Sequence, residues 1–411
     1  MTAKNNRLSR LPRNVWVVTA TSFLTDISSE MIVNLIPLFL ANVLGARTAV
    51  IGLIEGVAET TASLTKIYSG WLSDKLGRRK WLTVVGYGLS AAAKPFLYFA
   101  SLWGHVLGVR FADRLGKGIR TAPRDALVAE SIDKKQRGLA FGLHRAGDTA
   151  GAFFGLVIAA FIVWATQTDA GLLTRRTFQT AVLASIIPAV LAVVVLAIGA
   201  REVRREGAAQ APALRFEGLD KRFKIFLGVV VLFTLGNSSD AFIILRGQER
   251  GLNVLQVMGM LIAFNAIYAA LAGPLGALSD RVGRRRLIIG GWAAYGLVYL
   301  GFAISRTGWQ VWLLYALYGV YYAAAEGAAR ALIADLVPAE QRGTAYGLYN
   351  AAVGLTALPA SLIAGLLWQG AFGWHGFGAS APFFFGASLA LLASLLFWKA
   401  LPVKAAARYA R

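Results

Sequence analysis

The chain lacks cysteine altogether and has only 3 histidines among its 411 residues. The absence of cysteine excludes disulfide bonds and thiolate-ligated metal sites. Charged side chains are also scarce, at 15% of residues against about 25% in an average soluble domain. The sequence contains no nucleotide-binding glycine loop, no metalloprotease histidine pair and no nucleophile elbow, so it does not predict an enzyme or a cofactor.

Hydrophobic residues make up 57% of the chain, and it has 44 glycines. Apolar windows of about 20 residues, long enough to cross a bilayer, recur between basic clusters. The windows of the first half lie near residues 15–40, 49–72, 82–102, 104–128, 138–165 and 178–200. Those of the second half lie near residues 224–246, 254–278, 287–305, 309–336, 343–369 and 380–401. The sequence therefore predicts twelve membrane-spanning helices.

The formal net charge of +21 would raise the question of nucleic acid in a soluble chain. Here most Lys and Arg residues lie in alternate loops and in both tails. This pattern predicts a multi-pass protein of the inner (plasma) membrane, with both termini in the cytoplasm and no nucleic-acid partner. We expect a monomer of two bundles, residues 1–200 and 224–411, joined by a cytoplasmic linker at 201–223.

Two motifs are repeated in order in the two halves of the sequence. The stretch Gly70–Trp81 returns as Gly276–Leu287, and Gln136–His144 returns as Gln341–Tyr349. A tandem duplication of membrane helices is typical of transporters. Within the first motif, glycine allows a tight turn and an aspartate can pair with the arginines. This pattern predicts a conformational latch, although arginines at this place would also serve as a simple membrane anchor.

The repeated pattern Gly-x-x-x-Asp-x-x-Gly-Arg-Arg resembles the signature loop of the major facilitator superfamily. The resemblance covers the whole chain and implies an all-α membrane protein of twelve helices in two pseudo-symmetric six-helix bundles. It also implies a midplane cavity with alternating access. The gate and latch residues that we predict are Gly70, Asp74, Gly77, Arg78, Arg79, Arg124, Gly276, Asp280, Gly283, Arg284, Arg285 and Arg330.

Two further stretches resemble parts of that family more loosely. Gly147, Gly151 and Gly155 follow the spacing of its antiporter motif, with Ala152 in place of the proline. The segment Arg120–Leu127 resembles a bacterial subgroup that includes nickel-resistance exporters, although the histidine-rich tail of many such members is missing. Efflux is therefore expected, and oxygen ligands at Asp26, Glu30, Asn237 and Asp240 keep a divalent metal ion open as its cargo.

Basic residues form a stripe along one face of the fourth predicted span, at intervals of three and four residues. The stripe contains Arg110, Arg114, Lys117, Arg120 and Arg124. Intramembrane charges must face partners or water because each costs at least a few kcal/mol in lipid. The acidic residues of the first half are Asp26 and Glu30, Glu55 and Glu59, and Asp148, in three other spans. They can be proton-exchanging groups or permanent ion-pair partners of the stripe.

The second half has fewer charges in its spans, mainly Asp240, Glu326 and Arg330. Alignment of the halves places Ser238-Ser239-Asp240 against Ser28-Ser29-Glu30, and Glu326 against Arg120. We expect these last two to face each other across the cavity. The complete predicted site for substrate and protons is Asp26, Glu30, Arg114, Lys117, Arg120, Asp148, Asn237, Asp240 and Glu326.

Two other groups have alternative interpretations. His144, one turn before Asp148, can bind a metal or relay a proton, or it can be a packing residue, since Tyr349 stands at its place in the second half. The tyrosines near residues 315–322 can line a pocket or pack between helices. We predict a secondary active transporter, most simply a proton-coupled exporter of a small solute. A metal exporter, a proton-coupled importer of an organic solute and a channel are the alternatives.

Overall fold

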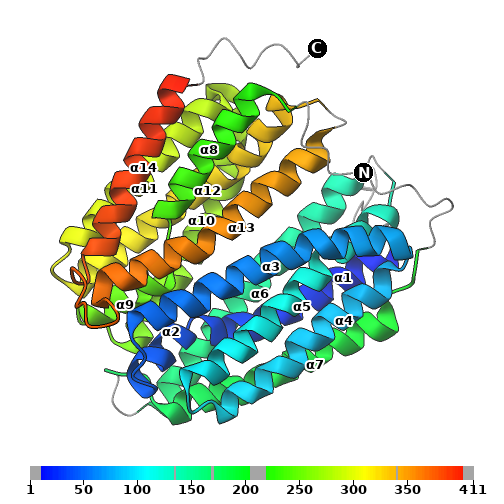
Figure 1. Cartoon of the computed structure of the whole chain (residues 1–411). Helices are drawn as coiled ribbons and strands as arrows, with labels where there is room; N and C mark the ends of the chain where they lie inside the picture. Colours follow the sequence, from blue (N-terminus) through cyan, green and yellow to red (C-terminus); the bar gives the residue numbers. More distant parts are fainter. Residues whose placement is uncertain (1–10, 134–135, 168–170, 204–218, 339–340, 401–411) are drawn as a thin grey trace, which may run out of the picture. The chain divides into compact units, whose positions relative to one another are not determined.

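The computed structural model describes residues 11–133, 136–167, 171–203, 219–338 and 341–400. Helices make up the architecture of these residues (Figure 1). The first half contains α1 (Arg13–Val33), α2 (Ile36–Leu38), η2 (Phe39–Val43), α3 (Thr48–Leu76), α4 (Arg79–Ala93), η3 (Lys94–Phe99), α5 (Trp103–Glu130), α6 (Arg137–Thr166) and α7 (Arg175–Gly199). The second half contains α8 (Lys221–Gly236), α9 (Ala241–Glu249), α10 (Val254–Val282), α11 (Arg284–Ile304), α12 (Gly308–Leu336), α13 (Arg342–Gln369) and α14 (Ala381–Ala400).

These helices form twelve passes, because α1, α2 and η2 follow one another in a single pass, as do α4 with η3 and α8 with α9. Eight passes are both long enough and apolar enough to cross a membrane by composition alone. Among the others, α3 and α5 have sufficient length but several charged residues. The predicted fold class, an all-α membrane protein with twelve passes, is confirmed.

The seventh pass is broken near its middle. Helix α8 ends at Gly236 and α9 begins at Ala241, which leaves residues 237–240 outside both helices. Backbone groups freed in this way must find other partners, so such breaks occur where protein or a cavity surrounds them. Here the Tyr295 hydroxyl donates to the Gly236 carbonyl over 3.1 Å, and the Ser239 amide donates to the Ser361 hydroxyl over 3.3 Å.

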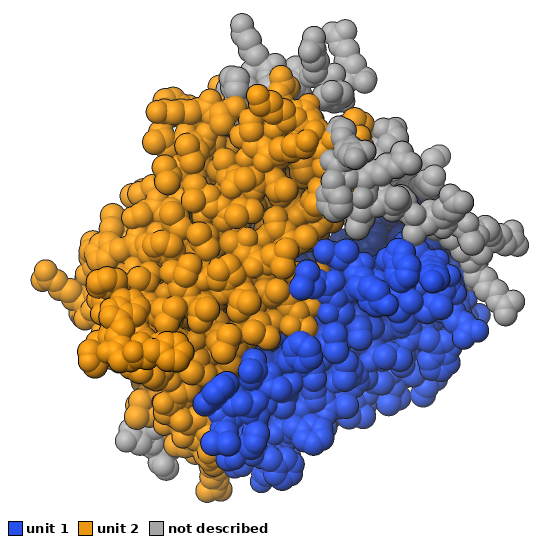
Figure 2. Space-filling view, in the orientation of Figure 1, with its two compact units in different colours: residues 1–33, 64–162, 178–212 blue, residues 34–63, 163–177, 213–411 orange. Residues whose placement is uncertain are grey.

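The chain forms two compact units that do not follow its two sequence halves (Figure 2). One unit contains residues 1–33, 64–162 and 178–212. The other contains residues 213–411 together with 34–63 and 163–177 from the first half. The predicted linker, 201–223, is described only at its two ends. The first unit is the part that contains residues 64–162, and the second unit is the part that contains residues 213–411.

Glycines bring helices close together in the first unit. On α6, a Cβ at Gly151 would lie 2.5 Å from the Phe23 carbonyl of α1, and one at Gly155 would lie 2.7 Å from the Ile27 carbonyl. On α4, a Cβ at Gly86 would lie 2.7 Å from the backbone of Arg120 on α5. These glycines therefore hold α1, α4, α5 and α6 near enough for their polar side chains to meet.

In the second unit, the first part of α3 packs closely against α13. A Cβ at Gly52 would overlap the Ser361 carbonyl, and one at Gly365 would overlap the Thr48 carbonyl. Hydrogen bonds follow the same line: the hydroxyl of Thr48 donates to the Gly365 carbonyl over 3.0 Å. The hydroxyl of Thr60 donates to the Gly354 carbonyl over 2.7 Å. Small residues thus join a helix of the first half to one of the second half.

This close packing predicts that Gly52→Ala destabilises the protein by roughly 1–3 kcal/mol, the usual effect of overpacking. The matched control is Gly228→Ala on α8, where nothing lies within 4 Å of the added Cβ. Alanine is a better helix former than glycine, so the control should be neutral or stabilising by up to about 1 kcal/mol. Thermal unfolding in detergent compares the two variants, and equal stability would contradict the packing.

Candidate functional site

The loop between α3 and α4 is organised around one buried arginine. The Arg79 guanidinium lies 2.7 Å from the Asp74 carboxylate and 3.1 Å from the Glu130 carboxylate of α5. It also donates to the Ser73 hydroxyl over 2.6 Å. Gly77 has a φ of +61°, a left-handed conformation that glycine adopts without strain, and this allows the turn between the two helices. The first copy of the predicted latch is therefore an ion-pair network centred on Arg79.

A carboxylate from outside the motif completes this network. Glu202, which follows α7, accepts hydrogen bonds from the backbone amides of Arg79 at 2.6 Å and Lys80 at 3.0 Å. A helix begins with amides that lack intrahelical partners and carries partial positive charge there, so a carboxylate stabilises it. Sequence analysis placed Glu202 in the polar linker and missed this role, because no local pattern connects it with α4.

The second copy of the motif uses a different arginine than the sequence alignment suggests. Arg284, the first residue of α11, lies 2.6 Å from the Asp335 carboxylate of α12. Arg79 is likewise the first residue of α4, although motif alignment pairs it with Arg285. Gly283 has a φ of +96°. Gly276 and Asp280 lie on α10, but the surroundings of both fall outside what the structure describes, so their predicted roles stay predictions.

The other predicted gate and latch residues have varied surroundings. Arg285 donates to the Trp398 carbonyl, Arg78 is exposed, and Gly70 packs near Ala122 of α5. The Arg330 side chain is exposed and its backbone carbonyl accepts from the Tyr346 hydroxyl over 2.8 Å. Arg124 lies 2.9 Å from Asp125, its neighbour on α5.

The first unit brings Asp26 and Glu30 together with part of the basic stripe. Asp26 is half-buried, and the charges of Glu30, Arg120 and Lys117 act on it. The Asp148 carboxylate of α6 lies within electrostatic range of Asp26 as well. Arg120 donates to the Ser90 hydroxyl over 2.9 Å and stands 4.3 Å from the centre of the Tyr87 ring. Acidic and basic groups that the sequence spreads over three helices therefore share one electrostatic site.

A buried lysine extends this site toward the far end of the same helices. The Lys94 ammonium group, at the start of η3, donates to the hydroxyls of Ser28 at 2.7 Å and Ser29 at 3.0 Å. Asp113 of α5 lies within electrostatic range of Lys94 and Arg114. Arg110 and Arg114 are also buried. The serine partners of Lys94 depend on the packing of η3 against α1, which no local sequence pattern predicts.

His144 belongs to a hydrogen-bonded chain in the first unit. Its Nε2 atom lies 3.0 Å from the Ser22 hydroxyl, and its Nδ1 atom lies 3.4 Å from the Asp148 carboxylate. The Ser22 hydroxyl in turn lies 2.9 Å from the Tyr87 hydroxyl. Tyr349, the residue in the corresponding place of the second half, instead stacks on Phe226. His144 is thus a polar member of the site and has surroundings unlike those of its repeat partner.

In the second unit, Asp240 stands at the break between α8 and α9. The hydroxyls of Tyr318 and Tyr315 on α12 point to its carboxylate from 3.4 and 3.5 Å. Asn237, at the other end of the break, accepts from the Tyr295 hydroxyl over 3.2 Å. Tyr315 and Tyr318 stack on each other and on Phe264, and both are buried. These tyrosines therefore pack between helices and also supply hydroxyls to the polar turn in the middle of the pass.

Two carboxylates from the first half of the sequence join Asp240. Glu55 and Glu59 of α3 lie within electrostatic range of it, because residues 34–63 belong to the second unit. The side chain of Glu326 falls outside the described residues, so its predicted pairing with Arg120 stays a prediction. Among the described side chains, no group of three or more His, Asp or Glu residues is arranged to hold a metal ion.

The Arg79 network predicts that two neighbouring arginines contribute very differently to the free energy of unfolding. Arg79→Ala removes the partner of two partly exposed carboxylates, and losing hydrogen bonds to charged groups costs about 1.5–3 kcal/mol. Arg78→Ala removes the exposed arginine beside it and should change the free energy of unfolding by less than about 0.5 kcal/mol. Thermal unfolding of both variants measures the difference. A stable Arg79→Ala protein would show that the network has no structural role.

The cluster around Lys94 predicts a compensating pair of substitutions. Asp113→Asn leaves an excess of positive charge in a buried place and should lower the yield of folded protein. Adding Lys94→Gln removes that excess, so the double variant should recover yield relative to Asp113→Asn alone. Size-exclusion chromatography of the solubilised protein quantifies the folded fraction. A double variant that folds worse than both single variants would contradict the predicted interaction.

Comparison with known proteins identifies the family to which this architecture belongs. The model of the Major Facilitator Superfamily matches residues 18–245 and 225–410. An uncharacterized MFS-type transporter of Methanocaldococcus jannaschii is 36% identical over 96% of this chain and 96% of its own length. A multi-drug resistance efflux pump of Streptococcus pneumoniae is 24% identical over 79% of this chain and 82% of its own length.

The fold is also found among solved structures. A D-xylose-proton symporter has a TM-score of 0.75 at 16% identity and covers 95% of this chain and 98% of its own. At that identity the likeness concerns the fold alone. The family model and the archaeal relative together cover nearly every residue described above. The chain therefore belongs to the major facilitator superfamily and is a multi-pass membrane transporter of the MFS type.

Proposed function

We propose that this transporter exports a small solute in exchange for protons, by alternating access. The observation that carries the proposal is the half-buried pair Asp26 and Glu30, one turn apart on α1 and close to the cations of α5. Two carboxylates at this spacing repel each other when both are ionised, so one proton shared by the pair is favoured. The nearby cations favour loss of that proton.

Protonation is coupled to transport if the distance between these carboxylates and cations changes during the transport cycle. Arg120 and Lys117 stand on α5, while Asp26 and Glu30 stand on α1. A small shift of one helix past the other would alter the cost of ionising the pair. His144, Ser22 and Tyr87 form a hydrogen-bonded chain beside them that can carry a proton to or from the pair.

We place the solute at the polar turn of the broken seventh pass. Asn237 and Asp240 bound that turn, and the tyrosine hydroxyls of α12 approach it. Discontinuous helices of transporters present backbone and side-chain polar groups to their cargo at membrane depth. Glu55 and Glu59 add negative charge near the same turn. This composition favours a cationic or hydrogen-bond-donating organic solute over an anion.

Export is supported by two observations. The relative from Streptococcus pneumoniae is an efflux pump, and the close fit of α6 against α1 uses Gly151 and Gly155, the glycines of the antiporter-like motif. The alternative of a divalent metal cargo draws less support, because the described acidic and histidine side chains do not converge into a metal-binding group. The predicted inner-membrane orientation, with cytoplasmic termini, would put the Arg79 network on the cytoplasmic side.

The test compares uphill transport with exchange. A thermal-stability screen with ethidium, nickel ions and D-xylose as first probes identifies a ligand of the purified protein, because a ligand that binds the folded state raises its unfolding temperature. Proteoliposomes loaded with that ligand are then given a pH gradient. We expect export against the ligand gradient with wild-type protein. Asp26→Asn/Glu30→Gln should abolish this uphill flux and retain downhill exchange, since no charge remains to couple.

Asp133→Asn is the matched control, because this carboxylate is exposed in the loop after α5. It should keep both fluxes. If the double amide variant still concentrated ligand with the pH gradient, the coupling carboxylates would not be these. If only nickel ions stabilised the protein and were moved by the gradient, the metal alternative would replace the organic solute.

A further inference from the structure

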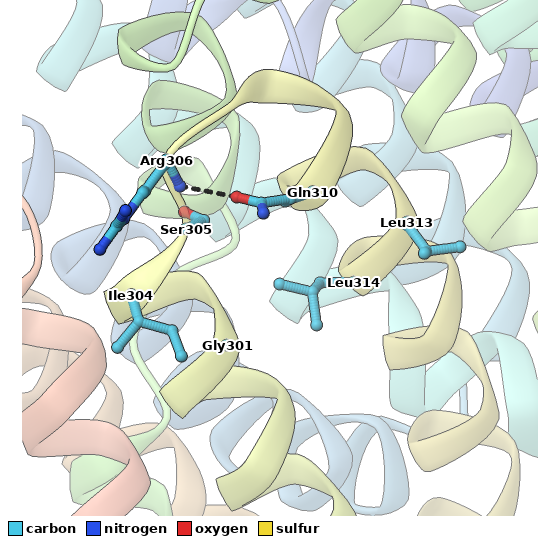
Figure 3. Close-up of a pocket in the computed structure, with 7 residues that line it drawn as sticks. All are labelled: Gly301, Ile304, Ser305, Arg306, Gln310, Leu313 and Leu314. Atoms are coloured by element: carbon cyan, nitrogen blue, oxygen red, sulfur yellow. Dashed lines mark hydrogen bonds between the residues drawn. The ribbon is translucent and has the colours of Figure 1, made fainter.

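A groove runs between the end of α11 and the start of α12 (Figure 3). Its volume is about 500 Å³, and its lining is Gly301, Ile304, Ser305, Arg306, Gln310, Leu313 and Leu314. The side chains of Ile304 and Leu313 are 62% and 51% exposed. These two helices are membrane passes, so the exposed apolar walls face the bilayer and lie open to lipid chains.

One end of the groove is polar and the rest is apolar. Arg306 and Gln310 stand at that end, where the Arg306 amide donates to the Gln310 side-chain oxygen over 2.7 Å (Figure 3). The Arg306 side chain is exposed, and among the described residues no carboxylate pairs with it. The groove thus offers a single positive charge beside a hydrocarbon surface.

The position of the polar end relative to the membrane follows from two tryptophans. Trp309 is 66% exposed, and its ring stacks on that of Trp312 with centroids 5.2 Å apart. Exposed tryptophan is typical of the interface between membrane and water, where lipid headgroups lie. Arg306 precedes Trp309 by three residues. Its guanidinium therefore lies at headgroup level while Ile304 and Leu313 lie at the level of the acyl chains.

Hydrogen bonds from Arg246 of α9 fix the α11 side of the groove. Arg246 is fully buried behind it and donates to the carbonyls of Phe302, Ala303 and Ser305, at the end of α11. It also binds Glu249 over 2.6 Å. These bonds satisfy the carbonyls that a helix end leaves without partners. The wall formed by α11 is therefore held in place independently of what occupies the groove.

We propose that this groove is a specific site for an anionic phospholipid. One acyl chain lies along Ile304, Leu313 and Leu314, and the phosphate binds Arg306, with Gln310 as a further hydrogen-bond donor. Charge complementarity selects the occupant: the guanidinium has no carboxylate partner among the described residues and lies where lipid phosphates are. A free anion would not use the apolar walls, and a neutral hydrophobic molecule would not use the arginine. The proposal is independent of the transported solute.

Binding of the anionic headgroup is tested with the full-length protein in phosphatidylcholine nanodiscs. These nanodiscs contain phosphatidylglycerol with a photoreactive acyl chain. Mass spectrometry maps the labelled peptides after illumination. We expect label on residues 301–314, and Arg306→Gln should lower it about fivefold, the effect of one basic residue at a membrane surface, or about 1 kcal/mol. Arg306→Lys should retain most of the label. Arg176→Gln, at an exposed arginine of α7 outside the groove, should retain all of it.

The acyl chain is tested with a second matched pair on α12. Leu313 and Leu317 are 51% and 50% exposed, one turn apart, and only Leu313 lines the groove. Leu313→Gln should lower the labelling, whereas Leu317→Gln should not. Absence of label from residues 301–314, or equal labelling with Arg306→Gln and wild type, would overturn the proposal. Displacement of the label by inorganic phosphate would also overturn it, by showing an anion site without a lipid.

Discussion

The cost of burying charge among membrane helices is the constraint on which this structure depends. Helix α5 carries a run of basic residues that lipid cannot accommodate. The first unit surrounds this helix with α1, α4 and α6, whose carboxylates and hydroxyls lie near the charges. Such closeness requires small residues where the helices meet, and Gly86, Gly151 and Gly155 provide it. These glycines therefore allow the close helix packing that brings the charges of α5 near their partners.

The second unit meets the same constraint with few charges. Asp240 receives tyrosine hydroxyls, and Arg246 is surrounded by backbone carbonyls of α11. The carbonyl at the end of α8 is satisfied by Tyr295. Charges in the first unit and tyrosine hydroxyls in the second unit are therefore two different ways to satisfy buried polar groups. In the proposed function, the first unit exchanges protons and the second unit binds the solute.

Much of the fold followed from the sequence, because the length of apolar windows and the repeat of Gly70–Trp81 are local properties. The repeated motif also singled out Arg79 and Arg284, which lie in ion pairs, and their role as latches stays a prediction. Contacts between distant segments were not predictable. Glu202 reaches the start of α4 only after α7 has packed, and Glu55 lies near Asp240 because residues 34–63 join the second unit. Arg246 is fully buried and donates to backbone carbonyls at the end of α11, a contact that no local sequence pattern predicts.

The central claim is that protonation of Asp26 and Glu30 sets the access state. The cysteine-free chain allows spin labels at two introduced cysteines, Arg78→Cys in the first unit and Arg286→Cys in the second unit, at exposed residues of the two copies of the repeated motif. Double electron–electron resonance then measures the distance between the labels. The account predicts different distances at acidic and at alkaline pH, and in Asp26→Asn/Glu30→Gln the acidic-pH distance at both. Identical distances at both pH values without the amide substitutions, or a pH response that persists with them, would contradict it.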